Sequence, residues 1–111
     1  MNIPEDAYLL RVYVGESDKH GHIPLYEGIV LAARKAGLAG ATVFRGVMGY
    51  GRHSVVHTVK ILRLSEDLPM VVEIVDSLEK IEAFLPVLDT MVVDGLVTLE
   101  RVRVIHYRSK E

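Results

Sequence analysis

Cysteine and tryptophan are absent from the 111-residue chain, and aromatic residues make up only 6% of it. Without cysteine there can be no disulfide, no thiolate nucleophile and no Cys-ligated zinc site, which suits a reducing compartment. Half of the residues are hydrophobic, so the core of a folded domain must be built mainly from aliphatic side chains. Because the formal net charge is −2, the composition argues against a nucleic-acid-binding protein that works through a basic face.

Long hydrophobic runs are also absent. No apolar stretch approaches the roughly 20 residues that a membrane-spanning helix needs. Residues 1–6 are polar and acidic, without the positive and apolar regions of a signal peptide. We therefore expect a cytoplasmic protein without membrane insertion, folded as a single domain over residues 1–111.

Hydrophobic periodicity predicts two helices and four strands in the order β-α-β, loop, β-α-β. The predicted strands are residues 8–14, 41–47, 70–75 and 96–107; the predicted helices are residues 24–37 and a segment after Asp76 that carries Leu78, Ile81, Leu85 and Leu88. Residues 16–22 and 48 to about 57 are expected to be loops, and 59–64 a short strand or the return arm of the second loop. This order is typical of an α+β, ferredoxin-like βαββαβ fold, in which a four-stranded antiparallel sheet carries both helices on one face. Its other face is left bare, which predicts self-association.

Local signals predict further details of these elements. Asp76 and Glu79 have the spacing of a capping box at the start of the second helix. Pro86, inside that helix, lacks a backbone N–H and is expected to bend the helix just before the proline. In the last strand the apolar alternation changes phase between Leu99 and Val102, which predicts a bulge or a bend. Residues 70–75 are nearly all apolar and are expected to form a central strand.

A glycine-rich turn is the sharpest candidate for ligand binding. Gly46, Gly49 and Gly51 lie close together at the end of the second predicted strand, and Arg52 follows them. Glycine lets a ligand approach the backbone, and successive N–H groups in such a turn can bind an anion. Arg52 would add a planar cation suited to phosphate. The alternative is that the glycines serve only a tight turn.

Other polar residues carry weaker signals. Arg101 and Arg103 are two residues apart, hence on one face of the last strand, where they either meet an anion or form an ordinary solvated surface. Two histidine pairs could hold a transition metal, although no carboxylate at a suitable spacing completes either pair. These pairs are His20 with His22 and His53 with His57. No nucleophile–base–acid arrangement is evident, so we do not expect an enzyme.

The sequence resembles the PII-like signalling proteins grouped as domain of unknown function 190, over nearly the whole chain. The segments that carry the resemblance are Pro24–Val30, Ala36–Gly51, Arg63–Pro69 and Val72–Asp76. The resemblance implies a homotrimer whose sheets pack around a central axis. It also implies that an adenine nucleotide (ATP, ADP or AMP) binds as a ligand in the cleft between subunits, with no catalytic cofactor.

The resemblance also implies which residues line that cleft. They are Gly49, Gly51, Arg52, His53, Asp94, Gly95, Arg101 and Arg103. Asp94–Gly95 is predicted to form a turn before the last strand and resembles the corresponding turn of PII proteins. The lysine that follows this turn in PII proteins is Leu96 here, which favours a different or more weakly charged nucleotide. The loop 48–68 is expected to relay occupancy to a protein partner, such as a membrane transporter or channel. Two alternatives remain: a metal-responsive trimer similar to CutA that uses the histidine pairs, and a small ferredoxin-like enzyme.

Overall fold

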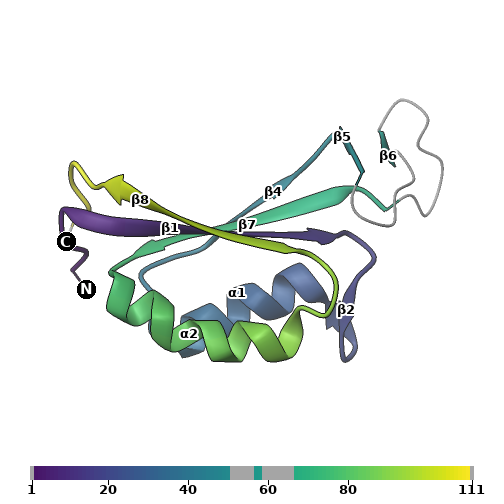
Figure 1. Ribbon diagram of the computed structural model, residues 1–111, viewed down its shortest axis with the longest axis horizontal. Helices are drawn as coiled ribbons and strands as arrows, with labels where there is room; N and C mark the ends of the chain where they lie inside the picture. The colour runs from purple at the N-terminus through teal and green to yellow at the C-terminus, as the bar shows by residue number, and fades with distance from the viewer. Residues whose placement is uncertain (1, 51–56, 59–66, 111) are drawn as a thin grey trace.

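One four-stranded antiparallel sheet carries two helices on the same side (Figure 1). The computed structural model describes residues 2–50, 57–58 and 67–110. The main elements are β1 (Asp6–Gly15), α1 (Leu25–Lys35), β4 (Thr42–Arg45), β7 (Pro69–Asp76), α2 (Leu78–Met91) and β8 (Leu96–Arg103). The strand order is β4-β7-β1-β8. The predicted ferredoxin-like fold is therefore confirmed, and β7 is central, as its apolar sequence predicts.

Two predicted loops contain short strands, which corrects the expectation of irregular structure there. Within residues 16–24, β2 (Lys19–His20) pairs with β3 (Ile23–Pro24), and Gly21 makes the turn with a φ of 63°. After β4, β5 (Met48–Gly49) pairs with β6 (His57–Thr58). Strands of two residues are too short to show an alternating pattern in the sequence. The predicted segment 59–64 lies outside the described residues.

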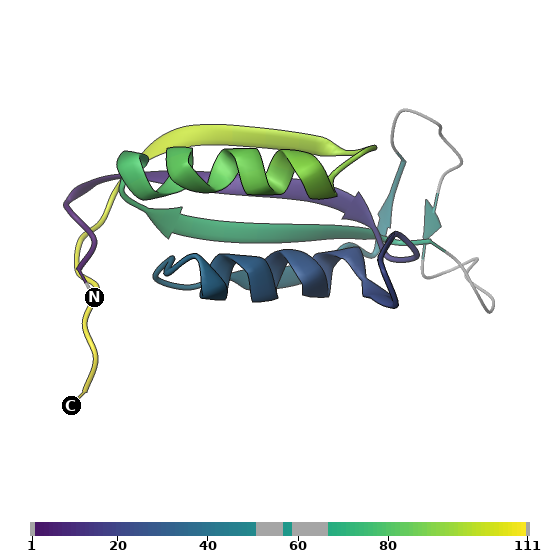
Figure 2. The ribbon, with the colours of Figure 1, turned by 90° about the horizontal axis from the view of Figure 1, so that it is seen from below.

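The core lies between the sheet and the two helices, which pack side by side (Figure 2). Alternate residues of β7, Met70, Val72 and Ile74, are buried there. From the helices, α1 contributes Ile29 and the small side chain of Ala33, among others, while α2 contributes the one buried aromatic residue of the core cluster, Phe84. The other members of the cluster are aliphatic or methionine: Leu10, Val12, Val14, Leu25, Leu38, Ile81, Leu88 and Met91. The composition correctly predicts this mainly aliphatic core.

The helix-free face of the sheet carries an ion network at its centre. The Arg11 side chain donates from Nε to Glu73 at 2.8 Å and from Nη1 to Glu100 at 2.7 Å. These residues come from β1, β7 and β8, so the network joins three neighbouring strands. The hydrogen bond to Glu73 raises the pKa of Arg11, the nearby charge of Glu100 adds to the rise, and partial desolvation opposes it. The charges on this face are therefore paired within one chain.

The start of α2 differs from the predicted capping box. The N-cap is Ser77, whose hydroxyl accepts a hydrogen bond from the Lys80 backbone N–H at 3.3 Å. Asp76 precedes it and is only 1% exposed. Its carboxylate accepts from the Ser77 N–H at 2.7 Å and from the Ala39 N–H at 2.9 Å. The predicted role of Asp76 as the cap is wrong because a distant loop uses its carboxylate instead.

Helix α2 continues through Pro86 and ends at Met91. Pro86 is exposed, so its ring does not enter the core. Neither helix in the described part of the chain is long and apolar enough to cross a membrane.

Strand β8 is shorter than predicted and has no bulge. It ends at Arg103 and pairs with β1 in one unbroken register, from Leu96 opposite Tyr13 to Arg103 opposite Asp6. The predicted bulge is wrong because β8 is an edge strand that is exposed along nearly its whole length. Its apolar residues are therefore not confined to one buried face. Leu99 pairs with Leu10 on the helix side of the sheet, whereas Val102 pairs with Ala7 on the other side.

Replacing Asp76 by alanine should destabilise the fold, because two backbone N–H groups would lose their carboxylate acceptor. We expect Asp76→Ala to lower the free energy of unfolding by roughly 1.5–3 kcal/mol, the range for hydrogen bonds to a charged group. Asp89→Ala removes an exposed aspartate of α2 and should change it by less than about 0.5 kcal/mol. Urea unfolding of both variants measures this, and equal losses would contradict the structural role of Asp76.

Candidate ligand-binding site

The first group of predicted site residues, after β4, is folded closely around Pro69. The Gly46 N–H donates to the Pro69 carbonyl at 2.7 Å. A Cβ atom on Gly46 would lie 2.7 Å from the Pro69 Cγ atom, and one on Gly49 would lie 3.0 Å from it. Close packing against the Pro69 ring therefore explains why residues 46 and 49 are glycine. The predicted phosphate-contacting residues Gly51, Arg52 and His53 lie outside the described residues.

Sequence reasoning missed a set of contacts beside this group. Arg45, the last residue of β4, forms an ion pair with Glu16 at 3.1 Å. The Glu16 N–H donates to the Leu68 carbonyl at 2.8 Å, and the Ser17 N–H donates to the Asp67 carboxylate at 2.7 Å. The turn after β1 thus contacts both residue 45 and residues 67–68. No local signal in the sequence predicts these contacts, because Arg45 is 29 residues from Glu16 and Asp67 is 50 residues from Ser17.

The second group, Asp94–Gly95, forms the predicted turn between α2 and β8. A Cβ atom on Gly95 would lie 2.6 Å from the Tyr13 carbonyl oxygen and 3.1 Å from the Val92 Cγ1 atom. Only glycine fits this approach without a shift of the backbone. Gly95 also lines a cavity of about 770 Å³ between α2 and β8, together with Leu85, Val93 and other residues.

The third group, Arg101 and Arg103, lies near the C-terminal end of β8. The two arginines share one face of the strand, as predicted, and both are exposed. Arg101 lies opposite Tyr8 in β1, and Arg103 lies opposite Asp6. The Arg103 Nε atom donates to the Glu5 carboxylate at 2.8 Å.

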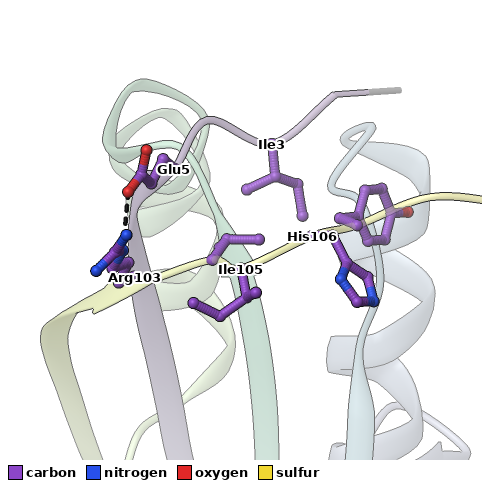
Figure 3. A pocket seen from close by; sticks show the side chains of 7 residues that line it. Ile3, Glu5, Arg103, Ile105 and His106 are labelled. Carbon is purple, nitrogen blue, oxygen red and sulfur yellow. Dashed lines mark hydrogen bonds and ion pairs between the residues drawn. The ribbon is translucent and has the colours of Figure 1, made fainter.

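Beyond Arg103 the chain crosses this end of the sheet. The Val104 N–H donates to the Glu5 carbonyl at 2.8 Å, and the Tyr107 hydroxyl donates to the Ala39 carbonyl at 3.0 Å. A cavity of about 310 Å³, which we call the terminal hollow, lies between the two ends of the chain and is lined by Ile3, Glu5, Arg103, Val104, Ile105, His106 and Tyr107. Figure 3 shows Ile3 and Ile105 facing each other across it, with the Glu5–Arg103 pair on one side and His106 on the other.

The predicted site residues do not come together within one chain. Gly95 and Arg103 are at opposite ends of β8, which is eight residues long and therefore spans roughly 25 Å. Gly49 and Gly95 lie at the same end of the sheet, but beside its opposite edge strands, β4 and β8. Three strand spacings of about 4.8 Å separate these edges, or roughly 14 Å. A site that used all three groups would need more than one copy of the chain.

The predicted histidine pairs do not form a recognisable metal centre in the residues that the structure covers. There, no group of three or more histidine, cysteine, aspartate or glutamate side chains could hold a metal ion. His20 and His22 are exposed in and beside the β2–β3 hairpin. His57 pairs with Gly49 through the backbone, and His53 is not among the described residues.

Comparison with known sequences gives matches over most of the chain. The model of the family described as Uncharacterized ACR, or DUF190, matches residues 7–104. A UPF0166 protein of Aquifex aeolicus (strain VF5) is 41% identical over 98 residues, which are 88% of this chain and 92% of that protein.

Comparison with solved structures gives similar folds at low sequence identity. CPII, a nitrogen regulatory PII-like protein from Thiomonas intermedia K12 solved with ADP, AMP and bicarbonate, matches with a TM-score of 0.61 at 17% identity, over 89% of this chain and 88% of CPII. CutA from Synechococcus elongatus PCC7942 matches with a TM-score of 0.59 at 14% identity, over 94% of this chain and 81% of CutA. At these identities the likeness establishes the fold, which is that of PII-like proteins.

A side chain at position 95 should strain the turn before β8. In Gly95→Ala the new Cβ would meet the Tyr13 carbonyl oxygen of β1, a backbone atom that cannot rotate away as a side chain can. We expect a loss of about 1–3 kcal/mol of unfolding free energy, typical of overpacking. Gly40→Ala is the matched control, since nothing lies within 4 Å of its added Cβ, and it should not destabilise the fold. Thermal unfolding compares the two variants. A Gly95→Ala protein as stable as the parent would contradict the close approach.

Proposed function

The chain belongs to the DUF190 family, described as Uncharacterized ACR, and we propose that it is a PII-like regulatory protein that binds an adenine nucleotide. ATP, ADP or AMP would bind as a ligand in the cleft between copies of a homotrimer, without catalysis. Occupancy would be relayed through the segment 48–68 to a protein partner, such as a membrane transporter or channel. Nucleic acid is not an expected partner.

The observation that carries this proposal is the separation of the predicted ligand residues along β8. A phosphate cannot contact both Gly95 and Arg103 of one chain across roughly 25 Å, yet two chains packed side by side could offer one group each. A PII-like protein of the same fold, CPII, has been solved with ADP and AMP. These two facts support a nucleotide cleft that needs a second copy.

The helix-free face supports self-association. Phe44, Val71, Tyr13 and Leu96 are cross-strand neighbours and form one apolar row across all four strands. Phe44 is 52% exposed and Leu96 is 55% exposed. The central charges of this face are already hydrogen-bonded to one another through Arg11. A second copy could cover the row without leaving a buried charge unpaired.

The ligand is tested by calorimetric titration of ADP, AMP and ATP into the parent protein and two arginine variants. We expect the parent to bind at least one of them and Arg52→Ala to bind it about 10- to 100-fold more weakly, because a hydrogen bond to a charged group is lost. Arg34→Ala removes an exposed arginine of α1 and should bind like the parent. If the parent bound none of the three nucleotides, or if Arg52→Ala bound as tightly as the parent, the proposal would be wrong.

A further inference from the structure

The two ends of the chain carry opposite charges. Residues 101–111 contain four lysine or arginine residues and one acidic residue, Glu111, whereas Glu5 and Asp6 are adjacent acids near the start of the chain. The pairing of β8 with β1 sets Arg103 opposite Asp6, and its guanidinium is bonded to Glu5 at 2.8 Å. The cation predicted to bind phosphate therefore already holds a carboxylate of its own chain, at the side of the terminal hollow (Figure 3).

The Glu5–Arg103 ion pair is weak enough for another anion to replace the Glu5 carboxylate. The side chains of Arg103 and Glu5 are 73% and 64% exposed, and ion pairs this open to water contribute little to stability. The contact uses the Nε–H group of Arg103. A guanidinium has five N–H donors arranged to bind planar carboxylate or the oxygens of phosphate. An incoming anion could therefore take the place of Glu5 at small cost to the fold.

The position of Glu5 does not depend on its side chain alone. The Glu5 carbonyl accepts a hydrogen bond from the Val104 N–H at 2.8 Å, next to the residue that the carboxylate contacts. This backbone contact holds Glu5 beside Arg103 whatever the charge of the Glu5 side chain. The carboxylate is thus kept at a high local concentration, so it competes with any free anion.

From these observations we propose that Glu5 is a built-in competitor for the ligand: in the free protein it occupies Arg103, and a bound nucleotide phosphate displaces it. This proposal rests on the nucleotide-binding function proposed above and adds a residue that lowers affinity. The chain then binds its ligand more weakly than Arg103 alone would allow.

The test is a double-mutant cycle between Glu5 and Arg103, with ADP, AMP and ATP as the titrated probes. We expect Glu5→Gln to tighten nucleotide binding about two- to fivefold, the factor that corresponds to an exposed ion pair. In the Arg103→Ala background the same substitution should have no effect, because the competition no longer exists. Glu79→Gln is the charge-matched control: Glu79 lies in the first turn of α2, at the same end of the sheet, and its removal should leave affinity unchanged.

Each other outcome has a distinct meaning. If the parent binds nucleotide but Glu5→Gln binds with parental affinity, or tightens binding equally with and without Arg103, then Glu5 does not compete and only this inference fails. If the parent binds none of the three nucleotides, both the proposed function and this inference are wrong. Amide exchange at Val104 separates competition from a structural role: it should be the same in Glu5→Gln and the parent. Faster exchange at Val104 in Glu5→Gln would mean that the carboxylate mainly holds the N-terminal segment in place.

Discussion

Strand β1 is hydrogen-bonded to β7 along one edge and to β8 along the other, through eight residue pairs on each side. This double pairing determines where the candidate ligand residues lie. It sets Leu96 opposite Tyr13, so the preceding Gly95 must approach the Tyr13 carbonyl. At the other end it sets Arg103 opposite Asp6, which brings the guanidinium within reach of Glu5. The pairing that builds the sheet therefore also keeps these two groups a full strand length apart.

A sheet covered by helices on one face only has a second consequence. Its other face presents an apolar row and, beside it, one guanidinium bonded to two carboxylates. Lone charges at this position would make covering the face costly, since a buried unpaired charge is strongly unfavourable. Because the Arg11 network is satisfied within the chain, the face is suited to contact with other copies. The proposed homotrimer would cover this face and could bring the separated candidate groups of neighbouring copies together.

The sequence predicts the central strand well. In β7 every second residue is buried and the residues between them are half-buried, so nearly every position favours an apolar side chain, and the apolar run indicates a place in the centre of the sheet. Strand β8 lies at an exposed edge, and the same reasoning there predicts a bulge that does not exist. The start of α2 is misread for another reason: Asp76 and Ser77 are both good capping residues. Only the fold shows that a loop 37 residues away takes the Asp76 carboxylate.

The candidate site is predicted less completely than the fold. Gly49 and Gly95 stand out in the sequence because a position where the backbone lies very close to another group favours glycine. The ion pairs Arg45–Glu16 and Arg103–Glu5 join residues 29 and 98 positions apart. Such pairs depend on strand register and on the path of the chain ends, which periodicity does not encode.

The central claim, that one ligand site is shared by two copies of the chain, is tested most directly by subunit complementation. One variant would carry Arg52→Ala, and the other Arg101→Ala with Arg103→Ala; each alone should bind nucleotide weakly. When the two are unfolded, mixed in equal amounts and refolded together, about one site in four of a cyclic trimer should receive both intact halves and regain parental affinity. A refolded mixture that binds no better than the two variants measured separately would contradict a shared site.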